Sequence, residues 1–259
     1  MNIFLEKSLD YAANRSYLDD LYRVYQTIPN GIRDINEKLW GKVEEAFTEM
    51  DNYELVLSLL KFEHFPIKDS YVSFLRRDKN AMERNPRTVN RLAGALREMG
   101  LDRIYQVCSE PKETNRQIGP MFKNWVNNGN LGLIPVSADV FLSSSEDAIL
   151  QGSDKEMAQI MQDLVGYDRE KGLDFVARIN GRYIIGEAKF LTDFGGHQNA
   201  QFNDAMTIFS SNCVAIKVAI LDGVCYIRGR SKMYEELTGA RKNQNIMSAL
   251  LLRDFIYSI

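Results

Sequence analysis

Residues 172–201 read GLDFVARINGRYIIGEAKFLTDFGGHQNAQ, and this stretch decides the fold of the chain. Two strands are predicted, at 175–179 and 182–190, because both runs are rich in β-branched and aromatic residues. The Asn180-Gly181 pair between them is among the strongest short signals for a β-hairpin turn. A loop with two adjacent glycines then leads into a helical pattern. We therefore expect a hairpin followed by a helix at the centre of the fold.

Three charged side chains are expected to meet at one end of this hairpin. Asp174 stands where the first strand begins, and Glu187 and Lys189 share one face of the second strand, near its end. Two carboxylates are hard oxygen ligands suited to Mg²⁺, and a metal held there polarises a phosphoryl oxygen and activates water. The neighbouring ammonium holds that water or offsets developing negative charge. The opposite strand face is small or apolar and is expected to pack inward: Ile184, Gly186, Ala188 and Phe190.

A Glu-x-Lys triplet alone is most often a solvated charge pair. The context favours a site here, because an aspartate, an Asn-Gly turn and a Gly-Gly loop accompany it. With these residues the stretch resembles the active site of the PD-(D/E)xK nuclease superfamily, in particular of type II restriction endonucleases. The resemblance implies Asp174 and Glu187 as Mg²⁺ ligands, the Ala188 carbonyl as a further ligand, and Lys189 beside the attacking water. Leu173 stands where the motif of that family has proline.

A looser likeness to these enzymes runs from about residue 85 to residue 259. It implies an α/β fold with a mixed-sheet core of order αβββαβ, and site-specific cleavage of double-stranded DNA to give 5′-phosphate ends. A homodimer is expected, because palindromic sites mirror two-fold protein symmetry. Gln198 and Gln201 are candidates for polar contacts with DNA near the active site, and a structural or DNA-contact role is favoured for His197 over that of a general base. Two other functions remain open: a nuclease of the same superfamily that serves repair, recombination or defence, and a non-catalytic DNA-binding module.

Composition sets the outer limits on function. A chain of 259 residues with 45% hydrophobic content can bury a full core. It contains neither an apolar run of membrane-spanning length nor a secretory signal at its start, so a cytoplasmic protein without a membrane partner is expected. Its cysteines lack paired spacing and are expected to be buried thiols: Cys108, Cys213 and Cys225. The net charge of −3 does not exclude DNA binding, because the local field decides it.

A basic segment at 76–97 lies inside this acidic chain. Within it, a helix is predicted over 86–99, because Asn85 suits the N-cap, Pro86 the first turn and Gly100 the position just past the end. The helix has an apolar stripe, and its other side carries residue types that contact phosphates and base edges: Arg87, Asn90, Arg91 and Arg97. This face is either a DNA-contact surface or a plain solvated face.

A second DNA-contact candidate is the polar stretch at 109–130, with Lys112, Asn115 and Arg116. The Gly119-Pro120 pair is expected to end one short helix before another begins. An equally good interpretation is a surface connector, anchored in the core by Phe122 and Trp125.

The remaining elements complete an expected division into a mainly helical part, 1–135, and a nuclease core, 136–259. Helices are predicted over 34–50, 53–62 and 231–259, and strands over 131–142, 213–221 and 224–228, the last two joined by a hairpin turn at Asp222-Gly223. Ser153 and Glu156 form a capping box for a helix that ends near residue 165. Glu156 is either this cap or an additional metal ligand, and we favour the cap.

Overall fold

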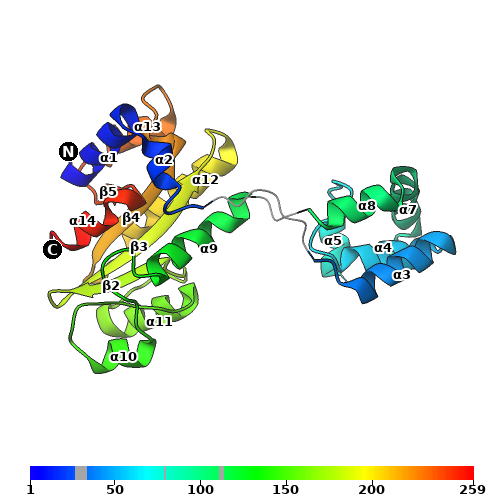
Figure 1. The fold of residues 1–259 in the computed structure, drawn as a ribbon, viewed down its shortest axis with the longest axis horizontal. Coiled ribbons are helices and arrows are strands. Elements are labelled where there is room, and N and C mark those ends of the chain that lie inside the picture. The colour runs from blue at the N-terminus through cyan, green and yellow to red at the C-terminus, as the bar shows by residue number, and fades with distance from the viewer. Residues whose placement is uncertain (27–33, 79, 111–113) are drawn as a thin grey trace. The chain divides into compact units, whose positions relative to one another are not determined.

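The computed structural model describes residues 1–26, 34–78, 80–110 and 114–259, apart from the side chains of 114–117. Contacts divide the chain into two compact units (Figure 1). The helical unit comprises Ile28–Lys112, and the sheet unit comprises Met1–Thr27 together with Glu113–Ile259. The sequence predicted one domain boundary, near residue 135, whereas the contacts in the structure give two boundaries, after Thr27 and after Lys112. The helical unit is thus inserted between two parts of the sheet unit.

The helical unit contains α3 (Glu37–Thr48), α4 (Asn52–Leu60), α5 (Val72–Arg77), α6 (Ala81–Arg84), α7 (Pro86–Met99) and α8 (Leu101–Cys108). Their apolar faces meet in a core of their own, which includes Val43, Leu55, Leu59, Leu92, Leu96 and Ile104. The predicted limits of α7 are confirmed, with Gly100 at a φ of 81° just past its end. Asn85 is the N-cap residue as predicted, but its side chain makes no capping hydrogen bond to α7, and its amide donates to the Ala81 carbonyl at 2.7 Å instead.

The sheet unit is built on a mixed sheet of five strands within its described residues. These are β1 (Ala148–Ile149), β2 (Phe175–Ile179), β3 (Arg182–Leu191), β4 (Ile216–Gly223) and β5 (Ile246–Met247), in that spatial order. β2 is antiparallel to both β1 and β3, whereas β4 is parallel to β3 and β5 is parallel to β4. The expected α/β fold class is confirmed. One detail of the αβββαβ order differs, because α11 (Asp154–Val165) lies between the first two strands.

The hairpin that the sequence predicted is formed by β2 and β3. Their register runs from the Ile179–Arg182 pair at the turn to the Phe175–Gly186 pair at the far end. Asn180 has a φ of 49° and Gly181 a φ of 70°. Positive φ at both central residues is the signature of the type I′ turn, which matches the twist of the strands. β3 pairs with β2 over residues 182–186 and with β4 over residues 184–191, so β4 holds its far end.

Two stretches that were expected as strands fold otherwise. Residues 131–142 lead into α10 (Ala138–Ser143), and residues 224–226 form the short 3-10 helix η2 (Val224–Tyr226). Gly223 has a φ of 94°, and a side chain on it would strike the Leu191 carbonyl. Asp222-Gly223 therefore ends β4 beside β3 and makes no hairpin turn. The tail is also only partly helical, because β5 and the 3-10 helix η3 (Ala249–Leu251) lie between α13 (Lys232–Thr238) and α14 (Leu252–Ile256).

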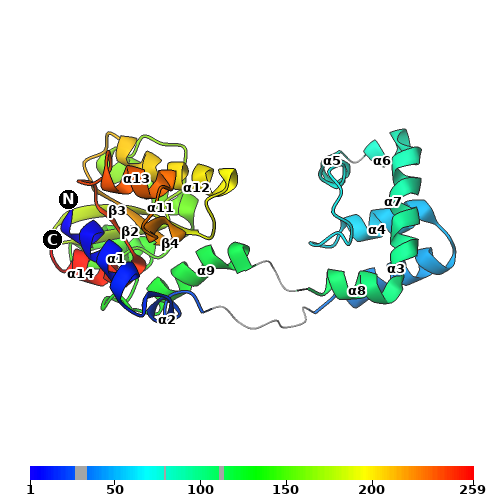
Figure 2. The ribbon, with the colours of Figure 1, turned by 90° about the horizontal axis from the view of Figure 1, so that it is seen from above.

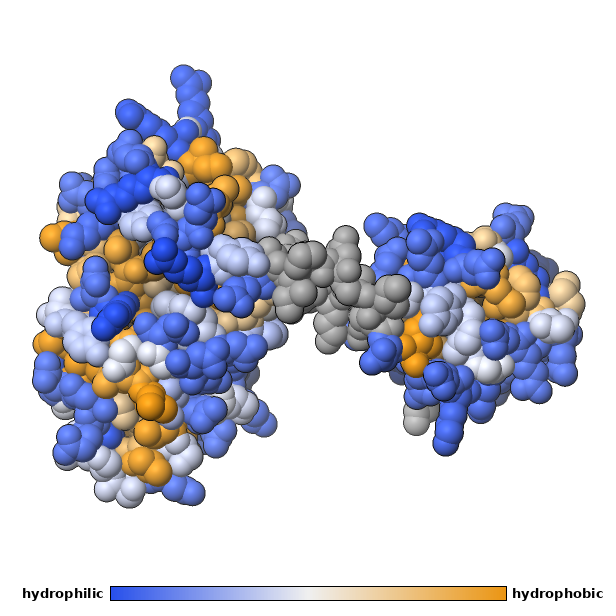
Figure 3. All heavy atoms as spheres, viewed as in Figure 1, coloured by the Kyte–Doolittle hydropathy of each residue, from blue (hydrophilic) through white to orange (hydrophobic). Residues whose placement is uncertain are grey.

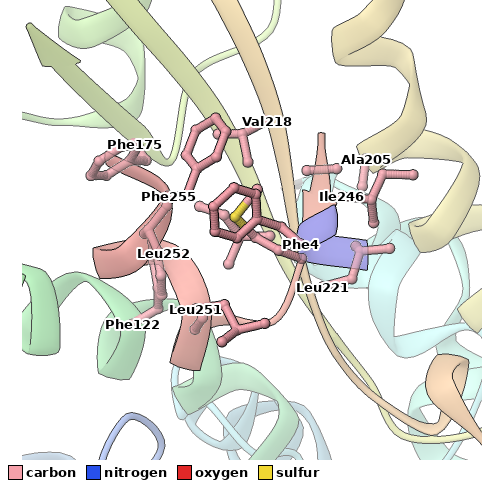
Figure 4. Packing of buried hydrophobic residues seen from close by; sticks show 14 of the residues in the cluster. Phe4, Phe122, Phe175, Ala205, Val218, Leu221, Ile246, Leu251, Leu252 and Phe255 are labelled. Carbon is pink, nitrogen blue, oxygen red and sulfur yellow. The ribbon is translucent and has the colours of Figure 1, made fainter. Parts of the chain in front are cut away.

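Helices cover both faces of the sheet. On one face, α1 (Ile3–Asn14), α9 (Thr114–Asn127) and α14 pack on the strands, and Figure 4 shows Phe4 and Phe255 of this core, whose ring centroids lie 5.3 Å apart. On the other face, α10 and α11 pack on alternate strand residues such as Val176 and Ile185. The predicted capping box begins α11. Both chain ends lie on the same side of the sheet unit (Figures 1 and 2), and Asn2 N donates to the Lys242 carbonyl, before β5, at 2.6 Å.

The surface shows mainly hydrophilic residues on the viewed face, interrupted by hydrophobic patches (Figure 3). In the part of the chain that the structure describes, no helix has the length and apolar character needed to cross a membrane. All three cysteines are buried thiols, as the sequence predicted.

Candidate active site

The far end of the hairpin brings the first candidate residues together. Asp174 directly precedes β2, and its backbone N–H donates to the Gly186 carbonyl at 3.1 Å. Asp174 is therefore next to Glu187 on the neighbouring strand. Its carboxylate oxygen Oδ2 accepts from the Ala188 N–H at 2.9 Å. The strand backbone thus fixes the direction of this carboxylate.

Lys189 lies between the two carboxylates. Its Nζ is 2.6 Å from Glu187 Oε1 and 3.5 Å from Asp174 Oδ2. The Glu187 side chain is only 4% exposed, whereas those of Asp174 and Lys189 are 21% and 23% exposed, so the lysine and the aspartate face the opening. The opposite strand face packs in the core as predicted, with Ile184 fully buried. The structure therefore brings together the three side chains that the sequence grouped.

Sequence reasoning missed two further members of this cluster. Lys171, in the loop before Asp174, reaches the same Glu187 oxygen at 2.7 Å. It also contacts Oδ2 of Asp204 at 2.5 Å, and Asp204 comes from α12 (Gly196–Met206), which follows β3. Asp204 Oδ2 is in turn 3.9 Å from Lys189 Nζ. Three carboxylates and two ammonium groups thus form one connected cluster. In the sequence, only the short spacing between Lys171 and Asp174 pointed to Lys171, and no local pattern pointed to Asp204.

Burial and charge set the ionisation of this cluster. Burial raises the pKa of Glu187 to about 7, and the negative charge of Asp174 adds to the rise, while both lysines oppose it. Burial lowers the pKa of Lys189, but Asp174 and Glu187 outweigh that effect, so its pKa is raised overall. Lys189 is therefore a cation at neutral pH, and at Glu187 the two lysines favour the ionised carboxylate against the effect of burial.

A cleft of about 320 Å³ opens beside the cluster. Asp174, Lys189 and Gln201 line it, together with Tyr25 from the N-terminal segment. Gln198 does not line it, because this side chain is buried and its Oε1 accepts from the Thr192 N–H at 3.1 Å. Of the two candidate glutamines, Gln201 faces the cleft and Gln198 braces the loop after β3.

Comparison with known protein families decides what this cluster belongs to. A family model described as Tsp45I type II restriction enzyme matches residues 2–259. The chain belongs to this family. It is therefore a site-specific deoxyribonuclease that acts on DNA, and the two other functions left open by the sequence give way to restriction. No curated protein and no solved structure matches the chain significantly.

Type II restriction enzymes, the class of the Tsp45I family, generally need a divalent metal ion. Among the residues that the structure describes, no three His, Cys, Asp or Glu side chains are grouped as a metal site. The donors at the hairpin nevertheless fit a small, hard cation. Mg²⁺ usually takes only one or two protein carboxylates and keeps several waters, and Asp174, Glu187 and the Ala188 carbonyl offer that set. Two ammonium groups already occupy a cation's place at Glu187.

The exposed face of α7 carries three of the four DNA-contact candidates that the sequence placed on this helix. Arg87, Asn90 and Arg91 are all exposed there. Asn90 Oδ1 accepts from the Asn52 amide at 3.0 Å, and the Arg91 guanidinium lies 2.7 Å from Asp69 Oδ2. These contacts are at the surface, and the bond to Asp69 uses one of the five donors of the Arg91 guanidinium.

Arg97 differs from the other three, because its guanidinium turns toward the fold. It donates to the backbone carbonyls of Phe47 at 2.5 Å and Ala46 at 3.2 Å, and its plane lies over the Phe47 ring. Both carbonyls belong to the last turn of α3, which has no intrahelical partner for them. Arg97 thus caps α3.

The second DNA-contact candidate falls largely on undescribed atoms. Lys112 lies outside the described residues, as do the side chains of Asn115 and Arg116. The predicted helix break is wrong, because α9 continues through Gly119-Pro120. Phe122 and Trp125 both pack in the main core, so the connector interpretation accounts for this part of α9.

The structure also places Glu156 and His197, for which the sequence left two roles open. Glu156 Oε2 accepts from the Ser153 N–H at 3.3 Å, which is the capping interaction that the sequence favoured. His197 is exposed in the first turn of α12.

Proposed function

We propose that this restriction enzyme is a Mg²⁺-dependent nuclease of the PD-(D/E)xK superfamily. In this proposal Asp174 and Glu187 are metal ligands, the Ala188 carbonyl is a further ligand, and Lys189 faces the attacking water. The observation that carries the proposal is the position of the Lys189 ammonium between two carboxylates, 2.6 Å from one and 3.5 Å from the other, at the edge of a cleft.

The residues of the chain have distinct roles in the proposed hydrolysis. Mg²⁺ at this site would supply Lewis-acid chemistry to the scissile phosphate. Lys189 orients a water against phosphorus and offsets the negative charge that develops there. As the water oxygen bonds to phosphorus, the bond to the 3′ oxygen breaks, that oxygen takes a proton from solvent, and the proton of the water passes to solvent. The products are 5′-phosphate and 3′-hydroxyl ends.

DNA contacts are proposed on two surfaces. Arg87, Asn90 and Arg91 of α7 offer guanidinium and amide groups of the kinds that contact phosphates and base edges. Gln201 lines the cleft and is proposed to contact the nucleotides next to the scissile bond. Arg97 and Gln198 are proposed to act through the fold, since each already contacts backbone groups. The residue types alone support a DNA role for Lys112, Asn115 and Arg116.

A homodimer is part of the proposal, because two copies related by two-fold symmetry match a palindromic site and cut both strands. The cytoplasm is the proposed location, since DNA that enters a cell is met there. Sedimentation with and without a DNA duplex that carries the cleavage site would measure the number of copies, and a monomer in both conditions would exclude the dimer.

Digestion of unmethylated phage DNA tests the proposed chemistry. We expect discrete bands that require Mg²⁺ and disappear with Lys189→Ala, and DNA ligase should rejoin the fragments without added kinase, as 5′-phosphate ends allow. Lys155→Ala is the matched control, because Lys155 is an exposed lysine of α11 in the same unit. Bands that persist undiminished with Lys189→Ala, or without any divalent metal, would exclude the proposed site.

A further inference from the structure

Lys171 and Asp204 are outside the proposed set of metal ligands, yet they contact it. Lys171 Nζ is 2.7 Å from Glu187 Oε1, 2.5 Å from Asp204 Oδ2 and 3.4 Å from the Asp204 backbone carbonyl. This lysine therefore has one acceptor on β3 and two acceptors on α12. Its side chain is 30% exposed, so it can move without disturbing the core.

Glu187 Oε1 accepts two ammonium groups at nearly the same distance, from Lys189 at 2.6 Å and from Lys171 at 2.7 Å. Together they carry the charge of one divalent cation. A Mg²⁺ ion bonds carboxylate oxygen at about 2.0–2.1 Å, so at this oxygen it would stand against both ammonium groups. The repulsion is strong in a site where Glu187 is almost completely buried. A metal that binds Oε1 therefore requires one ammonium group to withdraw.

The acceptors that each lysine keeps decide which one withdraws. Lys189 lies between two proposed metal ligands, and its next acceptor, Asp204 Oδ2, is 3.9 Å away. Lys171 keeps both acceptors on α12 when its contact with Glu187 breaks. Withdrawal costs less for Lys171, because its charge remains paired.

We propose that Lys171 is a positioning residue that occupies the place of the metal at Glu187 until the divalent cation binds, and that Asp204 then receives it. The inference rests on the proposed function, since it takes Glu187 as a metal ligand. Before the metal arrives, the contact of Lys171 with Oε1 holds the buried Glu187 side chain in place. Afterwards Lys171 keeps its contact with Asp204 of α12 and loses its contact with Glu187 of β3. Binding of the metal therefore breaks a link between α12 and β3.

Mn²⁺ binding to the full chain without DNA tests the exchange, measured by electron paramagnetic resonance. Mn²⁺ prefers the same oxygen ligands as Mg²⁺. Lys171→Met removes the competing charge at similar length, so Mn²⁺ affinity should rise about threefold or more. Asp204→Asn leaves Lys171 with Glu187 as its charged acceptor, so affinity should fall by a similar factor. The double variant should bind Mn²⁺ like Lys171→Met alone, because Asp204 then has no lysine to receive.

The double variant separates this exchange from a simple effect of charge. If Asp204 attracted the metal only through its own charge, the two single effects would cancel in the double variant, and its wild-type affinity would overturn the proposal. Unchanged affinity in Lys171→Met would overturn it as well. Lys155→Met controls for the loss of a positive charge elsewhere. If Lys171→Met does not fold, Lys171→Ala replaces it with the same expected gain in affinity.

Glu187→Gln distinguishes failure of this inference from failure of the proposed function. If it abolishes Mn²⁺ binding while the Lys171 and Asp204 variants bind like the wild type, the metal site stands and the exchange is wrong. If Glu187→Gln binds Mn²⁺ as the wild type does, the proposed metal site itself is wrong, and the exchange fails with it.

Discussion

At the scale of single residues, Asp222 joins the N-terminal segment of the chain to the C-terminal segment. Its carboxylate is fully buried at the end of β4 and accepts hydrogen bonds from the Tyr17 and Tyr25 hydroxyls at 2.9 Å each. It also accepts from the Ser248 hydroxyl at 2.5 Å and the Ala249 N–H at 3.1 Å. A buried carboxylate is costly without such donors. Burial still raises the pKa of Asp222 to about 6, against the effect of these hydrogen bonds.

We predict that Asp222→Asn destabilises the protein by about 2–4 kcal/mol. The NH₂ group of the new amide would replace an acceptor oxygen and face the hydroxyl and N–H donors that now bond to Asp222. The loss should depend on pH. Between about pH 4, where a free aspartate titrates, and about pH 6, the folded state binds more protons than the unfolded state. The neutral carboxyl therefore stabilises the wild type most below about pH 4, and that stabilisation is lost as the pH rises through about 6.

Urea unfolding over this pH range measures the effect. The difference in free energy of unfolding between wild type and Asp222→Asn should shrink as the pH rises. Asp139→Asn, which changes an exposed aspartate of α10, is the control for loss of a carboxylate at the surface. A difference that stays constant with pH would contradict the raised pKa.

At the scale of elements, those with local end signals could be predicted from the sequence and the others could not. The Asn180-Gly181 turn fixed the hairpin, and capping or terminal residues fixed α7 and α11. The stretches 131–142 and 224–228 were mistaken for strands, because β-propensity records only fit to a half-buried surface. Leu131 and Cys225 of these stretches are indeed fully buried, but in a loop and a 3-10 helix.

In the candidate site, too, contacts set by local sequence signals could be predicted and contacts set by packing could not. Asp174, Glu187 and Lys189 could be grouped from the sequence, because hairpin register alone joins them. Lys171 and Asp204 could not, because their contact spans 33 residues and depends on where α12 packs. Conversely, the sequence could not show that Arg97 reaches the end of α3, since that contact depends on helix packing.

Truncation of two arginines of α7 should affect different properties: stability for Arg97 and DNA binding for Arg87. Arg97→Ala should lower the free energy of unfolding by about 1–2 kcal/mol, because it removes the guanidinium donor of the Phe47 carbonyl, while the Ala46 carbonyl keeps its bond from the Asp51 N–H at 3.0 Å. Arg87→Ala should leave stability within about 0.5 kcal/mol, since the residue is exposed. It should instead weaken DNA binding and reduce the slope of log affinity against log salt by about 1.

Thermal unfolding and salt-dependent fluorescence anisotropy of labelled duplex DNA measure the two effects on the same preparations. An unchanged salt slope with Arg87→Ala would remove this arginine from the phosphate contacts. Unchanged stability with Arg97→Ala would contradict its capping role.

Gly94 gives α7 a second testable property. It lies in the middle of the helix on the exposed side, and a side chain there would meet nothing within 4 Å in the chain. Gly94→Ala should therefore stabilise the protein by about 0.5–1 kcal/mol, which thermal unfolding would detect. If α7 lies against DNA, Gly94→Gln should fold as well as Gly94→Ala but cleave DNA more slowly. Equal cleavage rates for the two variants would show that this part of α7 does not approach DNA closely.

At the scale of the whole molecule, the two units have separate cores. Every buried residue of the helical core lies between Val43 and Cys108, and the two cores of the sheet unit take none of their residues from that range. A core closed within one continuous segment is the usual mark of a domain that folds alone. The sheet unit, by contrast, needs two separate segments, because Phe4 and Tyr17 pack in the same core as Phe255.

We therefore predict that the fragment 34–110 folds by itself, with helical circular dichroism and a cooperative thermal transition. Because it carries α7 but not the cluster around Glu187, it should bind duplex DNA with salt-sensitive affinity and cut none. Its Arg87→Ala variant should fold equally well and bind DNA more weakly, which separates loss of contact from loss of structure. A folded fragment without any DNA affinity would assign DNA binding to the sheet unit or to the two units acting together. An unfolded fragment would show that the helical core needs contacts beyond its own segment, and that the insertion of this unit between two parts of the sheet unit is a condition of its stability.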